Sequence, residues 1–253
     1  MGGASRNDKK RRQDAASQRL AAAGIEVPVK ATANRTPLIV VGVVVLVAVI
    51  IGAAVLYFRN SSSGTAAAPT YTASVSGAVV TVGTGKVVVD TYEDYLCPIC
   101  NQFEKRYSAQ IVDALNAGRI TVRYHAIAIL DPSSTPAGYA TRAANAAVCS
   151  VAAGIYPVYH AKLYAEQPAE GSAGLTNEQL VTFGTQLGAT GDFAGCVNGA
   201  SFTKAVTAET QKAIADPALK NSDGKFGTPT LMIKGAAVDL NDSNWLKNAI
   251  AAG

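Results

Sequence analysis

Two cysteines separated by two residues are the part of this sequence with the clearest capacity for chemistry. Cys97 and Cys100 lie in the stretch YEDYLCPICNQFEKRY, residues 92–107. Such a pair can bind a metal ion, close a small structural disulfide or exchange electrons with another dithiol. The other candidate ligands and the elements that carry the pair discriminate between these three hypotheses.

Zinc and a structural staple explain the pair less well. A structural zinc site needs four close ligands, usually as two short-spaced pairs. The other two cysteines, Cys149 and Cys196, are far apart in the chain, and the two histidines, His125 and His160, form no ligand motif. A disulfide that closes so small a loop also constrains the unfolded chain little, because the stabilisation grows with loop length.

Redox exchange explains where the pair lies. The run KVVVDTY, residues 86–92, predicts a central strand, and an amphipathic helix is expected at about 98–117, directly after the first cysteine. At a helix start, unpaired backbone N–H groups and the helix dipole favour a thiolate, which is the nucleophile in exchange. We therefore expect Cys97 to be attacked or to attack, and Cys100 to resolve the mixed disulfide.

A second segment, FGTPTLMI, complements the pair from a distant part of the chain. Pro229 opens a predicted strand, where it removes one ladder hydrogen bond. A cis Thr228–Pro229 bond that faces the cysteines would turn this gap into an edge where a substrate backbone adds beside Thr228. The TPT triplet alone is unspecific, but CxxC at a strand–helix junction followed much later by a strand opened by proline is a specific combination.

The elements around these motifs predict an α/β core split by a helical insertion. Strands are expected at residues 78–82, 86–92, 120–129, 229–234 and 236–240. The helix at 98–117 between two of them predicts a right-handed crossover and parallel pairing. Residues 136–217 are rich in alanine and helical in pattern, with Thr176 and Ser201 expected to begin two helices. A closing helix is expected at 242–251.

With these motifs the chain resembles the DsbA-like thiol–disulfide oxidoreductases of the thioredoxin superfamily, in particular the membrane-anchored kind of actinobacteria. The resemblance covers about residues 75–251 and rests on YEDYLCPICNQFE, the helical insertion and GTPT. It implies a thioredoxin fold with Cys97 as the attacking cysteine, Cys100 as the resolving cysteine and Pro229 as the cis-proline. It also implies reoxidation by a quinone-linked membrane partner, of the vitamin K epoxide reductase type; no cofactor or metal is expected.

Two positions depart from the family pattern. The best-known periplasmic member has histidine just before its second cysteine, where this chain has Ile99 after Pro98. Isoleucine cannot donate to a thiolate, so we expect a weaker oxidant. Many thioredoxin-like proteins also have an acid six residues before the first cysteine, a position held here by Thr91. Glu93 and Asp94 lie nearby and are candidates for proton transfer, the alternative being a solvated or structural pair.

The remaining cysteines and histidines receive structural interpretations. Cys149 lies in the predicted helix ATRAANAAVCSVAAG and Cys196 in DFAGCVNGAS, and we expect a structural disulfide within the insertion, worth about 4 kcal/mol on the chain-entropy model. A second shuttle pair or two buried free thiols are the alternatives. His125 and His160 are expected to be ordinary structural or surface residues, and Trp245 to anchor the last helix to the sheet.

The N-terminal part of the chain predicts a membrane anchor. Residues 37–58 carry no charge, and a helix of that length spans about 33 Å, enough for the ~30 Å hydrocarbon core. Residues 1–36 hold eight Lys/Arg and three acids, whereas 59–253 hold 14 and 15. Because basic flanks stay in the cytoplasm, we expect a cytoplasmic tail, an uncleaved signal-anchor and an exported remainder. A cleaved signal peptide is the alternative.

The expected organisation is a tail at 1–36, the anchor at 37–58, a flexible tether at 59–74 and the catalytic domain at 75–253. All four cysteines lie in the exported part, which fits an oxidising compartment. The basic run KKRR fits membrane topology and anionic lipid better than nucleic acid. The main hypothesis is an enzyme that introduces disulfides into exported proteins. A reductase or isomerase on the same scaffold is the first alternative, and a non-catalytic binding or chaperone module the second.

Overall fold

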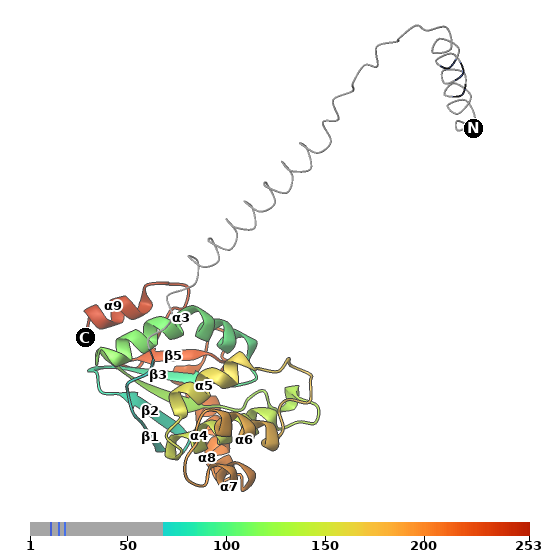
Figure 1. Ribbon diagram of the computed structural model, residues 1–253. Coiled ribbons are helices and arrows are strands. Elements are labelled where there is room, and N and C mark those ends of the chain that lie inside the picture. Colours follow the sequence, from blue (N-terminus) through green and yellow to red (C-terminus); the bar gives the residue numbers. More distant parts are fainter. Residues whose placement is uncertain (1–10, 12–14, 16–17, 19–67) are drawn as a thin grey trace. The chain divides into compact units, whose positions relative to one another are not determined.

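The computed structural model describes residues 68–253 together with positions 11, 15 and 18 (Figure 1). The predicted anchor at 37–58 and nearly all of the predicted tail lie outside the described residues. No helix that the structure describes is both long enough and apolar enough to cross a membrane.

A mixed sheet of six strands lies at the centre of the described domain. In spatial order the strands are β1 (Ala73–Ser76), β2 (Val79–Gly83), β4 (Ile120–Ala126), β3 (Val87–Glu93), β5 (Thr230–Ile233) and β6 (Ala236–Ala237). β3 and β4 pair in parallel, from Val87 opposite Ile120 to Glu93 opposite Ala126, and the other neighbours are antiparallel. The parallel pair confirms the predicted crossover through α3 (Pro98–Asn116).

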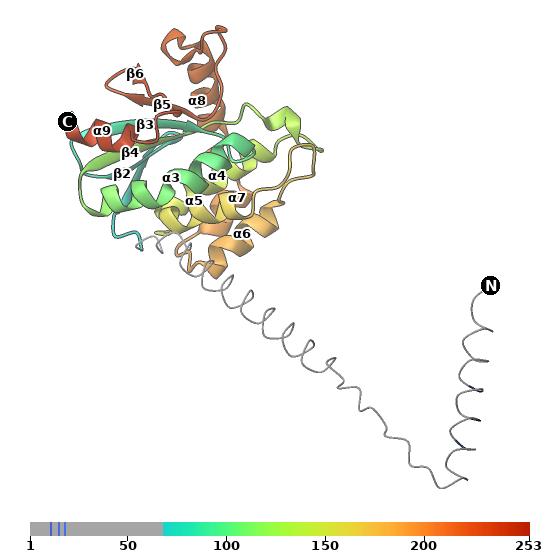
Figure 2. The ribbon, with the colours of Figure 1, turned by 90° about the horizontal axis from the view of Figure 1, so that it is seen from above.

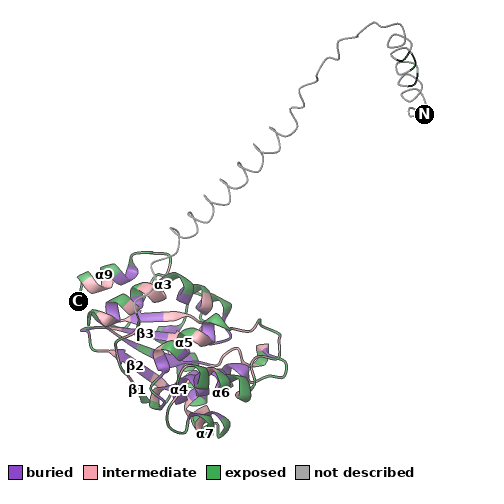
Figure 3. Ribbon diagram, in the orientation of Figure 1, coloured by how far each residue is buried: buried purple, intermediate pink, exposed green. Residues whose placement is uncertain are grey.

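The two faces of strand β3 are covered by different helices. Its buried residues alternate, so that Val89, Thr91 and Glu93 point to one side of the sheet. That side is covered by α3 and α5 (Tyr156–Ala165), whereas α8 (Thr203–Ala215) covers the other (Figure 2). Buried residues gather on the strands and on the helix faces turned toward them (Figure 3).

The predicted helical insertion lies between β4 and β5. Its elements are η1 (Asp131–Ser133), α4 (Tyr139–Ala152), α5, α6 (Asn177–Gln186), α7 (Phe193–Asn198), α8 and η2 (Pro217–Leu219). Thr176 begins α6 as the sequence predicts, and it does so in a capping box with Gln179. The prediction for Ser201 is wrong: Phe202 precedes α8 without a side-chain cap, and the Ser201 N–H closes the turn after α7 by donating to the Cys196 carbonyl.

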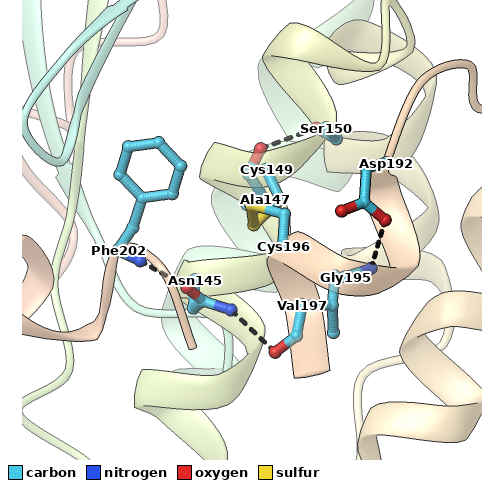
Figure 4. The surroundings of a disulfide bond; sticks show 9 residues. All are labelled: Asn145, Ala147, Cys149, Ser150, Asp192, Gly195, Cys196, Val197 and Phe202. Carbon is cyan, nitrogen blue, oxygen red and sulfur yellow. Dashed lines mark hydrogen bonds between the residues drawn. A yellow bond between two sulfur atoms is a disulfide. The ribbon is translucent and has the colours of Figure 1, made fainter. Parts of the chain in front are cut away.

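The predicted disulfide between Cys149 and Cys196 is present and joins α4 to α7, with Cα atoms 5.9 Å apart (Figure 4). One residue of α4 reinforces the junction. The side-chain amide of Asn145 donates to the Val197 carbonyl at 3.3 Å and accepts from the Phe202 N–H at 2.8 Å. The insertion is therefore tied together by one covalent bond and by hydrogen bonds beside it.

The ends of the domain differ from the sequence prediction in three ways. β1 was not predicted, because its residues are mostly exposed and lack an apolar run. β6 is shorter than predicted, and α9 (Trp245–Ala251) begins later than the predicted closing helix. Trp245 is buried and anchors α9 to α3, with its ring 6.3 Å from Phe103 and 5.8 Å from Tyr107.

Candidate active site

The two cysteines of the CPIC motif lie at the junction between β3 and α3. Cys97 is the N-cap residue of α3, with an extended backbone, and its sulfur accepts the backbone N–H of Cys100 at 3.4 Å. Pro98 occupies the first turn, where no N–H is needed. Both thiols are free and buried, with 5% of Cys97 and 1% of Cys100 exposed. The helix start thus presents an unused backbone donor to the Cys97 sulfur.

The cis-proline segment, which lies far along the sequence, faces this helix start. The Thr228–Pro229 bond is cis and directly precedes β5. The Cys97 thiol donates to the Thr228 carbonyl oxygen at 3.2 Å. The sequence segments CPIC and TPT, which are 131 positions apart at this contact, therefore form one site.

The surroundings shift the pKa values of the two thiols in opposite directions. The pKa of Cys97 is lowered to about 6, chiefly by the hydrogen bond with the Cys100 thiol and, against the opposing effect of burial, by Thr228 and the backbone N–H groups of Cys100 and Ile99. The pKa of Cys100 is raised well above its ordinary value, first by burial and then by its hydrogen bond to Cys97. At neutral pH Cys97 is a thiolate and Cys100 a thiol, which is the division that an attacking and a resolving cysteine require.

Asp94, one of the two predicted proton-transfer residues, is a fully buried structural acid of the loop before α3. Its carboxylate accepts the N–H of Leu96 at 2.8 Å and the N–H of Leu130 at 2.9 Å. Burial raises the pKa of Asp94 to about 7, against the effect of these two hydrogen bonds, and the charge of Cys97 raises it further. The solvated alternative is excluded, since none of the carboxylate is exposed.

Glu93, the other predicted residue, belongs to a buried charged cluster with His160 and Glu104. Its Oε1 lies 2.7 Å from His160 Nε2. Burial favours the neutral imidazole, but the charges of Glu93 and Glu104 outweigh it and raise the pKa of His160 to about 9. Burial raises the pKa of Glu104 to about 7, and its Oε1 has no hydrogen-bond partner among the described residues.

This cluster can hold a proton beneath the redox pair. Glu104 lies four residues after Cys100 on α3, so the two side chains share one buried face. The donor atoms of Glu93, Glu104 and His160 all lie within 4.8 Å of one another, close enough to share a cation. Two of these three ligand atoms, those of Glu93 and His160, already form a hydrogen bond with each other. The cluster is therefore an ion pair beside a protonatable acid.

The sequence analysis did not name Glu104, and it took His160 for an ordinary structural or surface residue, although one signal for Glu104 was present. An acid on a helix face that is otherwise apolar, one turn after a reactive cysteine, is unusual. His160 lies about 60 positions further along the chain, and only the packing of α5 on α3 brings it there. Neither histidine is at the surface: His125 lies on the opposite face of the sheet, 3.0 Å from Asp90 and 2.6 Å from Glu209.

A cavity of about 310 Å³ borders the redox motif. It is lined by Ile99, Gln102, Phe103, Arg106, Tyr107, Pro229, Leu240 and Asn241. Ile99, 55% exposed, stands between the two cysteines and contributes an apolar surface where the best-known family member has a histidine. The residues that line the cavity come from the CPIC motif, the rest of α3, the cis-proline and the segment after β6.

A thioredoxin fold that brings a CxxC dithiol at a helix start against a cis-proline defines the class of thiol–disulfide oxidoreductases. A family model described as Thioredoxin matches residues 80–252, and the chain belongs to this family. The solved structures that it resembles narrow the class to DsbA-type enzymes of actinobacteria.

Reduced DsbA of Mycobacterium tuberculosis is 26% identical, with a TM-score of 0.57, over 66% of this chain and 82% of that one. Reduced DsbG of the same species, a disulfide bond oxidoreductase, is 29% identical, with a TM-score of 0.57, over 66% and 77%. MdbA of Corynebacterium diphtheriae, a thiol-disulfide oxidoreductase, shares the fold at 22% identity, with a TM-score of 0.62, over 74% and 96%. The chain is accordingly a DsbA-like thiol–disulfide oxidoreductase.

A curated relative is much longer than the matched region. The serine/threonine-protein kinase PknE of M. tuberculosis is 27% identical over 180 residues, which are 69% of this chain. The match spans 31% of the kinase, so this chain corresponds to about a third of that protein.

Proposed function

We propose that the enzyme introduces disulfide bonds into exported proteins and that residues 37–58 hold it at the membrane. The observation that carries the proposal is the position of Cys97 at the start of α3, where its sulfur accepts the Cys100 N–H. These surroundings stabilise the thiolate of the reduced enzyme. A more stable reduced form makes the corresponding disulfide a stronger oxidant.

The reaction begins with the oxidised Cys97–Cys100 disulfide. A substrate thiolate attacks the Cys97 sulfur, an enzyme–substrate disulfide forms, and Cys100 leaves as a thiolate that takes up a proton because its pKa is high. A second substrate thiolate then attacks the substrate sulfur of the mixed disulfide. Cys97 leaves as a thiolate, the substrate carries a new disulfide, and the enzyme has gained two electrons.

Two features fit a protein segment as the substrate. The cis-proline loop offers a backbone edge at Thr228, where an extended chain can add as a strand. The cavity beside Ile99 offers apolar surface to a neighbouring side chain. A partially folded exported protein with two free cysteines supplies both an extended backbone and apolar residues.

The cycle closes when a membrane protein accepts the two electrons. We propose a quinone-linked reoxidant of the vitamin K epoxide reductase type, consistent with an anchor at 37–58 that confines the enzyme to the same membrane. The charge asymmetry of the sequence supports a cytoplasmic N-terminus and an exported catalytic domain. Protease protection on intact cells tests this topology: the domain should be digested from outside, and a protected domain would contradict it.

The reduction potential of the Cys97–Cys100 pair distinguishes an oxidase from the reductase alternative. We expect the full-length chain, equilibrated with glutathione buffers, to lie between the about −270 mV of thioredoxin and the about −120 mV of the strong oxidant DsbA. The lowered Cys97 pKa argues against a potential as low as that of thioredoxin. Ile99, which cannot donate to the thiolate, argues against one as high as that of DsbA. A value at or below about −270 mV would assign the enzyme to the reductases.

A further inference from the structure

A glutamine of the helical insertion binds the active-site turn directly. Gln167 lies just after α5, where its N–H donates to the Tyr164 carbonyl. Its side-chain Nε2 donates to the Tyr95 carbonyl at 3.0 Å and to the Cys97 carbonyl at 3.0 Å. Its Oε1 accepts from the side-chain amide of Asn101 at 3.1 Å. One planar amide therefore holds three positions, two before α3 and one in its first turn.

These contacts fix the backbone of the residue whose sulfur reacts. The Cys97 carbonyl is the first acceptor of α3, since it also accepts the Asn101 N–H at 3.2 Å. Rotation of this peptide would move the Cys97 side chain relative to the Cys100 N–H. That contact is already long at 3.4 Å, and a hydrogen bond weakens steeply as distance and angle depart from their optimum.

The hydrogen bonds from Gln167 to the two carbonyl groups are shielded from water. Gln167 is half-buried and Tyr95 is 1% exposed, so water competes little for the two carbonyl groups. In such surroundings a hydrogen bond is electrostatically stronger than at an exposed surface. The insertion also packs on this turn, because the Tyr95 and Tyr164 rings lie with their centroids 5.2 Å apart.

We propose that Gln167 is a positioning residue that holds the Cys97 N-cap geometry from the helical insertion and thereby sets the thiolate stability of the redox pair. It touches no reacting atom. Its effect is transmitted through the Cys97 carbonyl, which keeps the sulfur on the Cys100 N–H. The inference rests on the proposed exchange at Cys97 and adds a specific link between the insertion and the redox motif.

Two substitutions of Gln167 in the full-length chain test the link. Gln167→Met keeps the approximate size but removes the donor and the acceptor. Gln167→Glu keeps the shape but replaces the donor to both carbonyls by an anion. Gln186→Met is the matched control, since Gln186 is an exposed glutamine at the end of α6 in the same insertion. Thiolate absorbance titrated against pH reports the Cys97 pKa, and glutathione equilibration reports the potential.

We expect Gln167→Met to raise the Cys97 pKa by about half a unit to one unit, the size of one net hydrogen bond. A rise of one unit lowers the thiolate-to-thiol ratio tenfold and makes the potential about 30 mV less oxidising. Gln167→Glu should raise the pKa by more, because its anion faces two carbonyl dipoles and the thiolate. Gln186→Met should titrate as the unsubstituted chain does.

The outcomes separate this inference from the proposed function. An unsubstituted Cys97 that titrates like free cysteine would contradict the proposed function itself. A low pKa in the unsubstituted chain that stays the same in both Gln167 variants would overturn the positioning role alone. If Gln167→Met reduces the folded yield, Gln167→Glu, which retains the shape, decides the question by the same two readouts.

Discussion

Cys97 and Cys149, one from each cysteine pair of this chain, are both buried but lie at different places in a helix. Cys97 is 5% exposed and Cys149 is 2% exposed. Cys149 lies inside α4, where the backbone N–H groups are used by the helix, and it is bonded to Cys196 of α7. Cys97 lies at the start of α3, where the Cys100 N–H is free to meet its sulfur. The position of a cysteine relative to the end of a helix, rather than its exposure, decides whether it serves exchange or stability.

The largest expected effect on activity comes from replacing a cysteine of the Cys97–Cys100 pair. Cys97→Ser should reduce oxidation of a two-cysteine test peptide to the uncatalysed rate, because no sulfur remains to form the mixed disulfide. Cys100→Ser should still let the Cys97 thiolate attack a test peptide that carries a disulfide, and the enzyme–peptide disulfide should persist because no resolving thiol remains. Mass spectrometry of the trapped product identifies the attacked sulfur, and a product bonded through Cys100 in the Cys97→Ser chain would contradict the assignment.

Removal of the other pair should affect stability instead of chemistry. Replacing both Cys149 and Cys196 by alanine should lower the free energy of unfolding by about 4 kcal/mol, measured in denaturant, because the denatured chain gains freedom. Peptide oxidation by the folded variant should continue at a comparable rate.

Peptide mapping of the unsubstituted chain gives the matching control. Under mild reduction only Cys97 and Cys100 should be alkylated, since the distal pair joins two packed helices. Equal alkylation of all four cysteines would show that the distal pair also exchanges.

Glu104, the buried acid in the second turn of α3, contrasts with Cys97 at the start of the same helix. Burial raises the pKa of Glu104 from 4.5 to about 7, so the folded state binds a proton more tightly than the unfolded state. The corresponding stability is present below about pH 4.5 and is lost as the pH rises through 7. Glu104→Gln should remove much of this pH dependence, on the order of 3 kcal/mol between pH 4.5 and 8, in denaturant titrations.

The same substitution separates two sources of reactivity. If the helix start controls Cys97, Glu104→Gln should leave the Cys97 pKa near its original value while changing the pH profile of stability. A Cys97 pKa that moves together with the stability profile would show that the buried charges, rather than the helix start, control the thiolate.

The sequence predicted the parts of the molecule that depend on local patterns. The valine-rich β3, the helix after Cys97, the start of α6 at Thr176 and the parallel crossover all follow from spacing and residue type. It could not place contacts between segments that meet only after the insertion has packed. His160 lies in the middle of α5 and Gln167 just after its end, and neither carries a motif of its own. Their roles depend on how α5 lies against α3, which no short-range pattern determines.

The smallest expected effect comes from adding a hydrogen-bond donor beside the Cys97–Cys100 pair. Ile99→His places an imidazole between the two cysteines, where it can stabilise the Cys97 thiolate. The Cys97 pKa should fall from about 6 by up to one further unit, which corresponds to about 1.4 kcal/mol. The reduced form gains that stability, so the variant should oxidise a test peptide more completely at equilibrium. Ile99→Asn, polar but not cationic, is the control for size and polarity. A similar shift in both variants would attribute the change to polarity at position 99, and no shift in either would show that Cys100 and Thr228 already saturate the thiolate.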